Sequence, residues 1–74
     1  MRAVIETWRD GICDGRPETV TPYPDRESAV HAAETAWGHL TEQERRRYRV
    51  LAVESYDGVD WGRAEWIWDS EEVA

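Results

Sequence analysis

The chain has 74 residues, 16 of them acidic and nine basic, and a formal net charge of −7 at pH 7. A chain of this length forms a single domain with a thin core, which leaves little volume for an enclosed active-site pocket. It contains no apolar run typical of a membrane span or a signal peptide, and its single cysteine, Cys13, cannot form an intramolecular disulfide, so we expect a cytoplasmic protein.

The first third of the chain predicts two β-strands. Residues 2–10 are rich in β-branched and aromatic side chains, which favour a strand. Residues 18–23 predict a second strand, and Pro22 places it at the edge of a sheet because proline cannot donate a hydrogen bond to a neighbouring strand. Two Asp-Gly turn dipeptides lie between these segments, so the register of this first hairpin is left open.

The middle of the chain predicts two helices. Asp25 is a good N-cap for a helix over residues 26–39. Apolar side chains at spacings of three, four and three residues predict its buried face, namely Val30, Ala33, Trp37 and Leu40. Thr41 and Glu44 match a capping box, which predicts a short second helix over residues 42–47.

The last part of the chain predicts a β-hairpin formed by residues 48–56 and 60–69. If Asp57-Gly58 forms a two-residue type I′ turn, Leu51 pairs with Ala64. This register places one face of the hairpin beneath the main helix, with Arg49, Leu51, Val53, Trp66 and Trp68. It gives the opposite face a mixture of aromatic, aliphatic and charged side chains, among them Tyr48, Glu54, Trp61, Glu65 and Ile67.

The element order ββα(α)ββ predicts an α+β fold in which residues 1–74 form one domain. A helical crossover from an edge strand to the far side of the first strand gives a four-stranded antiparallel sheet in the order 2-1-3-4. The main helix covers one face of this sheet. We expect the other face to be open to water or to a partner, as antiparallel sheets allow.

The pattern of polar residues argues against catalysis. Paired carboxylates need a pocket or a neighbouring charge to separate their pKa values, and a small sheet with one helix offers little room for one. His31 and His39 lie eight residues apart on the predicted helix and do not form an i, i+4 metal-binding pair. The sequence 57–60 lacks the ligand pattern of a calcium loop. We therefore expect no enzymatic activity, no cofactor and no metal site.

Residues 54–74 combine acidic and aromatic side chains. They carry seven acidic residues against one arginine, a net charge of −6, and three of the five tryptophans. Aromatic anchors supply affinity at protein interfaces, and carboxylates steer and orient a basic partner. The sequence therefore predicts a protein-binding surface with the contact residues Glu54, Asp57, Asp60, Trp61, Glu65 and Asp69, supported by the apolar Tyr48 and Ile67.

Carboxylates spread over a rigid sheet can also imitate the phosphates of a nucleic acid. The predicted partner is therefore a basic protein surface, such as the groove of a nucleic-acid-binding protein, and the predicted role is that of an inhibitor or adaptor.

Three alternatives remain open. The tryptophans can simply replace the missing phenylalanines in the core while the acids keep the protein soluble. Two open sheet faces can pack in a symmetric homodimer. Finally, Tyr48 lies within a basic cluster that could bind nucleic acid through Arg45, Arg46, Arg47 and Arg49, although the net charge of −7 disfavours direct binding.

One segment resembles a known pattern. Residues 37–48, WGHLTEQERRRY, are similar to the helix-end signature W-x-H-L-T-x-x-E-[RK] of small uncharacterised proteins carried by bacterial mobile elements, and the likeness extends loosely from Tyr23 through Val53. That group has no assigned activity, so the resemblance implies no active-site residues. The size, acidity and single-domain character of the chain also resemble anti-CRISPR and other anti-defence proteins, which implies binding to a protein such as a CRISPR effector rather than catalysis.

Overall fold

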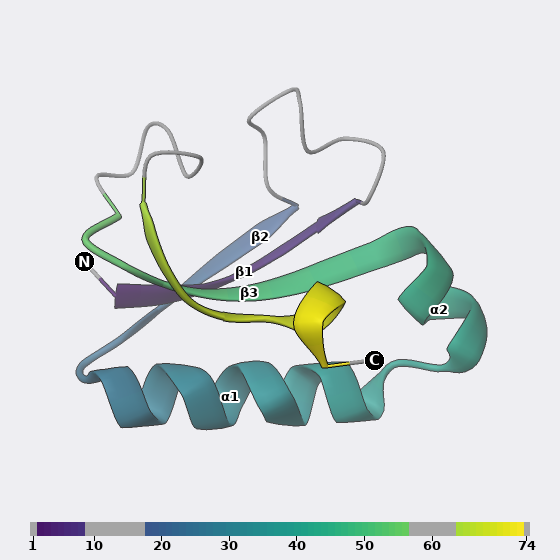
Figure 1. Cartoon of the computed structure of the whole chain (residues 1–74), viewed down its shortest axis with the longest axis horizontal. Helices are drawn as coiled ribbons and strands as arrows, with labels where there is room; N and C mark the ends of the chain where they lie inside the picture. Colours follow the sequence, from purple (N-terminus) through teal and green to yellow (C-terminus); the bar gives the residue numbers. More distant parts are fainter. Residues whose placement is uncertain (1, 9–17, 57–63, 74) are drawn as a thin grey trace.

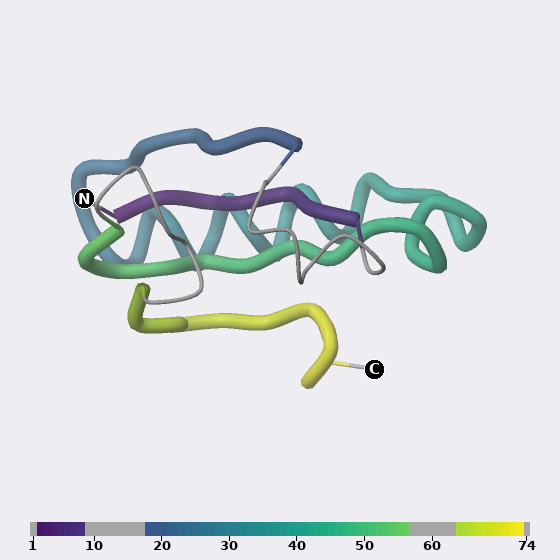
Figure 2. Tube along the Cα trace, turned by 90° about the horizontal axis from the view of Figure 1, so that it is seen from above, coloured from purple at the N-terminus to yellow at the C-terminus, as the bar shows by residue number. Residues whose placement is uncertain are grey.

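The computed structural model describes residues 2–8, 18–56 and 64–73. Its elements are β1 (Arg2–Trp8), β2 (Thr19–Tyr23), α1 (Arg26–His39), α2 (Glu42–Arg47), β3 (Tyr48–Glu54), β4 (Glu65–Asp69) and the 3₁₀ turn η3 (Ser70–Glu72). The four strands form one antiparallel sheet in the order β2-β1-β3-β4, and α1 lies along one face of it (Figures 1 and 2). The predicted α+β fold, with its strand order, is confirmed.

Local hydrogen bonds determine where α1 begins and ends. The backbone N–H of Ser28 donates to Asp25 Oδ1 at 2.7 Å, as expected of an N-cap. At the other end, the N–H of Leu40 donates to the carbonyl oxygen of Trp37. The buried residues of α1 are Ala29 and Ala33, whose small side chains let the helix approach the sheet closely. The predicted apolar stripe of the helix therefore does face the sheet.

The capping box of α2 is also present. Glu44 N–H donates to Thr41 Oγ1 at 3.1 Å, and Thr41 N–H donates to Glu44 Oε1 at 2.9 Å. Arg45 then ties α2 back to α1, because its guanidinium donates to the carbonyl oxygen of Trp37 at 3.0 and 3.2 Å and lies 4.8 Å from the centre of the Trp37 ring. This contact satisfies a carbonyl group at the end of α1.

The prediction of one open sheet face is wrong for the part of the chain that the structure describes. On the helix side, the buried sheet residues are Val4, Val50 and Ala52. On the opposite side, a second cluster contains Ala3, Ile5, Leu51, Val53, Tyr56 and Ala64, and the first four of these are 0% exposed. Both faces of the sheet are therefore buried.

The face assignment and the register of the last hairpin are corrected as well. Leu51 and Val53 lie on the face away from α1, not beneath it. Leu51 pairs with Asp69 instead of Ala64. β3 ends at Glu54 and β4 begins at Glu65, and Ser55, which directly follows β3, adopts a left-handed φ of 62°. The predicted Asp57-Gly58 turn lies outside the described residues.

A bulge in β4 explains how its aromatic residues are distributed. Ala52 pairs with Trp68 and Val53 pairs with Trp66, so Ile67 is an extra residue in the ladder. As a result, Ile67 and Trp68 both pack on the helix-side cluster. Trp66 instead lies beside Arg49, which belongs to the opposite face. Simple alternation along β4 cannot produce this arrangement.

Candidate binding surfaces

Two of the predicted contact residues serve as internal ion-pair partners. Glu54 is half-buried, and its Oε1 accepts a hydrogen bond from Arg2 Nε at 2.8 Å and lies 2.8 Å from Arg2 Nη2 in an ion pair. Asp69 is only 6% exposed and forms a bidentate ion pair with Arg49, whose Nε donates at 2.9 Å. Its carboxylate also caps η3 by accepting from the N–H of Glu71 at 2.9 Å. Asp69 is therefore a structural residue, and its predicted role as a surface contact does not fit its burial.

The Arg49–Asp69 pair shapes this end of the sheet. Hydrogen bonding to Asp69 raises the pKa of the Arg49 guanidinium against the opposing effect of burial, and the nearby charges of Glu71 and Glu72 add to the increase. Arg49 also stacks on Trp66, with its guanidinium carbon 4.7 Å from the ring centre. Together these contacts hold β4 and η3 against β3.

Two other predicted contacts, Tyr48 and Ile67, are half-buried, the first at the start of β3 and the second in β4. Ile67 packs on the helix-side cluster, where it contributes to stability. Tyr48 opposes Trp8 across the β1–β3 pair. The predicted contacts Asp57, Asp60 and Trp61 lie outside the described residues.

The exposed acidic residues of the C-terminal part of the chain lie on a surface that we call the β4–η3 edge. This surface consists of the edge strand β4 and the turn that follows it, with Glu65, Trp66, Glu71 and Glu72 exposed. Trp66 keeps 40% of its surface exposed although Arg49 covers one side of its ring. Within the described residues, β4 pairs only with β3. The opposite edge strand, β2, contains Pro22, whereas β4 contains no proline.

The basic cluster does not act as one positive surface. Arg45 and Arg49 are held by the internal contacts described above. Within the part of the chain that the structure describes, Arg46 forms one exposed i, i+4 ion pair, with Glu42 at 3.6 Å. Arg47 makes no hydrogen bond or ion pair with another residue in the described ranges. Two of the four arginines are therefore available to a ligand.

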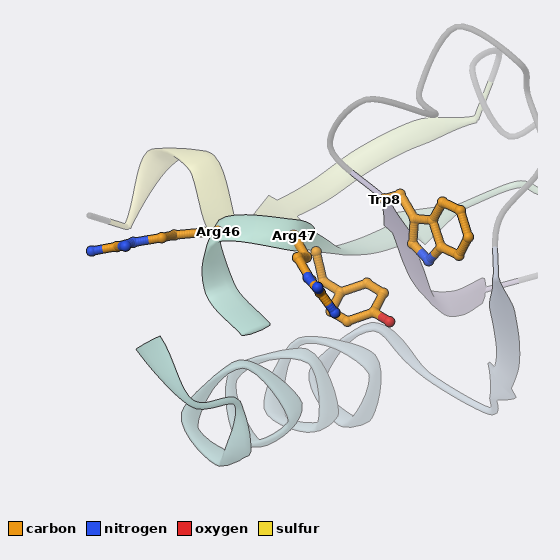
Figure 3. Close-up of a pocket in the computed structure, with 4 residues that line it drawn as sticks. Trp8, Arg46 and Arg47 are labelled. Carbon is orange, nitrogen blue, oxygen red and sulfur yellow. The ribbon is translucent and has the colours of Figure 1, made fainter. Parts of the chain in front are cut away.

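These two arginines border a shallow surface depression, which we call the Trp8–Arg47 hollow. It has a volume of about 280 Å³ and is lined by Trp8, Arg46, Arg47 and Tyr48 (Figure 3). Trp8 is 57% exposed, and its indole N–H donates to Glu18 Oε2 at 2.7 Å. Sequence reasoning did not identify Trp8. The only indication in the sequence is a tryptophan at the end of a predicted strand, since its contact with Tyr48 depends on strand pairing.

The structure also bears on metals, membranes and self-association. No three His, Cys, Asp or Glu side chains gather as a metal site anywhere in residues 2–8, 18–56 and 64–73. Over the same ranges, no helix is long and apolar enough to cross a membrane. The predicted face-to-face homodimer loses its surface, because the sheet residues it would use, such as Ile5 and Leu51, are already buried within the chain.

Comparisons of this chain with protein-family models, with curated proteins and with solved structures found no match.

Proposed function

We propose that this protein is a non-enzymatic inhibitor or adaptor that binds a basic protein surface through the β4–η3 edge. The observation that carries this proposal is an edge strand free of proline, with Trp66 40% exposed and exposed carboxylates at both ends. Glu65 lies at the start of β4, and Glu71 and Glu72 follow its end. An aromatic anchor flanked by charges of one sign is suited to a partner of the opposite sign.

The mode of binding follows from the position of β4. An edge strand presents backbone N–H and C=O groups that can pair with a strand of another chain. On the opposite edge, Pro22 of β2 lacks the N–H that such pairing requires. A basic strand added to β4 would place its cationic side chains close to Glu65 at one end and to Glu71 and Glu72 at the other.

The partner class proposed here is a protein that normally holds DNA or RNA. The predicted contacts Asp57, Asp60 and Trp61 precede β4 in the sequence and lie outside the described residues, so they remain predictions. A surface of this charge can occupy a groove built for phosphates, which is how an anti-CRISPR or other anti-defence inhibitor would act. Support for a non-enzymatic role comes from Glu54 and Asp69, two carboxylates that the fold uses in ion pairs.

Binding of a synthetic peptide with alternating lysine and valine tests the proposal. Chemical-shift mapping should place the largest changes on the amides of residues 65–72, and hydrogen exchange should slow along β4. Raising the salt concentration should weaken binding, because exposed charges are screened. Shifts concentrated on α1 would contradict the proposed surface.

Two double variants of equal charge separate a specific edge from general attraction. Glu65→Lys with Glu72→Lys changes the β4–η3 edge, and Glu27→Lys with Glu34→Lys makes the same change on the exposed side of α1. We expect the first pair to weaken peptide binding by about tenfold or more, and the second by less than about threefold. Equal losses would mean that only net charge matters and would overturn the proposal.

A further inference from the structure

The Trp8–Arg47 hollow has the opposite character to the β4–η3 edge. It combines two aromatic rings with two arginines, although the chain as a whole is strongly acidic. Trp8 and Tyr48 are paired across β1 and β3, so their side chains project from the same face of the sheet. Arg47 ends α2 and immediately precedes Tyr48, and its side chain lines the hollow together with the two rings.

The charges around the hollow are arranged unevenly. Arg47 makes no ion pair with another described residue, and the Arg46 side chain extends away from Trp8 (Figure 3). The exposed Arg46–Glu42 pair at 3.6 Å is weak, because water competes with it. On the other side, the Glu18 carboxylate holds the indole N–H of Trp8 at 2.7 Å. An anionic group is therefore attracted to the arginine side and repelled from the Glu18 side.

The Trp8 ring supplies the second part of the recognition. An exposed indole whose N–H is already bonded to Glu18 is held in orientation and offers its face to another planar group. Base stacking on aromatic side chains, together with arginine contacts to phosphate, is the common mode of nucleotide-unit binding. A volume of about 280 Å³ lies just below the usual range of about 300–1,000 Å³ for ligand sites, so it suits one such unit rather than a long strand.

We propose that the Trp8–Arg47 hollow binds a single nucleotide unit, with the base stacked on Trp8 and the phosphate on Arg47. Tyr48 forms the floor beside the base, and Arg46 adds positive potential at the rim. The unit is either a free nucleotide or one residue of a single strand, since the two share this chemistry. An acidic peptide would use the arginines but would leave the ring of Trp8 without a planar partner.

Titration of the full chain with adenosine monophosphate, followed by nuclear magnetic resonance, tests the proposal. The indole N–H signal of Trp8 and the side-chain signal of Arg47 should shift together at millimolar ligand. Ribose 5-phosphate, which lacks the base, should bind more weakly by about fivefold or more. Equal binding of the two compounds would overturn the stacking role of Trp8, and no shift at Trp8 would overturn the site.

Matched variants locate the phosphate. Arg47→Gln should weaken binding of adenosine monophosphate by about tenfold, whereas Arg26→Gln, an equal charge change at the exposed start of α1, should weaken it by less than about twofold. Equal effects of these two variants would overturn the assignment of Arg47. Because both arginines are exposed, both variants should fold, which thermal unfolding checks directly.

Two further titrations identify the natural form of the ligand. Tighter binding of a short single-stranded oligonucleotide than of the mononucleotide would show that the unit belongs to a strand. Equal or weaker binding would show that it is a free nucleotide, because the net charge of −7 repels the additional phosphates of a strand. Tighter binding of an acidic peptide than of either nucleotide would contradict the proposed ligand class.

Discussion

The molecule combines an arginine, a tryptophan and a carboxylate at two sites, with different results. At one site, Arg49 stacks on Trp66 and pairs with Asp69, and the side chains of the arginine and the carboxylate are 14% and 7% exposed. At the other site, Arg47 and Trp8 line the same hollow, and the Trp8 indole N–H donates to the exposed Glu18. Burial decides the outcome. In the first site the charges neutralise each other and hold strands together, while in the second the arginine remains available to a ligand.

Removal of the buried carboxylate should give the largest effect. Asp69→Ala leaves the Arg49 guanidinium without its ion-pair partner and removes the cap of η3, so we expect the free energy of unfolding to fall by about 3 kcal/mol. Urea denaturation measures this change. The matched variant Glu18→Ala removes an exposed carboxylate and should cost less than about 1 kcal/mol. Similar losses of stability for both variants would contradict the view that only the Arg49–Asp69 site holds the fold together.

Truncation of Trp66 should lower the free energy of unfolding more than truncation of Trp8, by a smaller margin than between the two carboxylate variants. Trp66→Ala removes a ring that stacks on Arg49 and is more buried than Trp8, so we expect a loss of about 2 kcal/mol. Trp8→Ala should cost about 1 kcal/mol or less, because 57% of that residue is already exposed. Thermal unfolding of both variants provides the comparison, and a greater loss at Trp8 would contradict it.

The local features of the fold and the order of the strands were predictable from the sequence, whereas the register of β4 and the side-chain contacts between distant residues were not. Asp25 and the Thr41–Glu44 box form hydrogen bonds only three residues along the chain, so the sequence pattern contains both partners. This is why α1 and α2 begin and end where predicted. Strand order followed in turn from the position of the helical crossover and the edge strand with Pro22.

The register of β4 depends on other information. It places Asp69 against Arg49, 20 residues away, and includes a bulge that sends Ile67 and Trp68 to the same face. Neither the ion pair nor the bulge produces a periodic pattern in the sequence. The residues of the binding surfaces were only partly predictable for the same reason, because strand pairing brings some of them together. Glu65 was predicted and is exposed, but Trp8 and Tyr48 are 40 residues apart and only the pairing of β1 with β3 brings them together.

Asp25 is a third carboxylate to compare with Asp69 and Glu18. It is exposed, and its main hydrogen bond comes from a backbone N–H group. The bonds from Ser28 lower the pKa of the Asp25 carboxyl below its ordinary value. Because the folded pKa lies below the unfolded one, the stabilisation is present at neutral pH and disappears as the pH falls through the folded pKa. The melting temperatures of the wild type and Asp25→Ala should therefore differ at pH 7 and converge in acid. A constant difference across this range would contradict the assignment.

The smallest expected effect concerns the charge of Glu18. Glu18→Gln keeps an oxygen that can accept the Trp8 indole N–H but removes the negative charge beside the hollow. Stability should be nearly unchanged. Binding of adenosine monophosphate should strengthen by about two- to threefold, because an exposed charge on the far side of the hollow from the phosphate contributes only a few tenths of a kcal/mol. Glu27→Gln, an exposed change on α1, is the control and should leave binding unchanged. If Glu18→Gln instead weakens binding, the carboxylate orients the Trp8 ring in a way that the amide cannot reproduce. Glu18 would then have a structural role like that of Asp69, and the contrast between the two sites would be wrong.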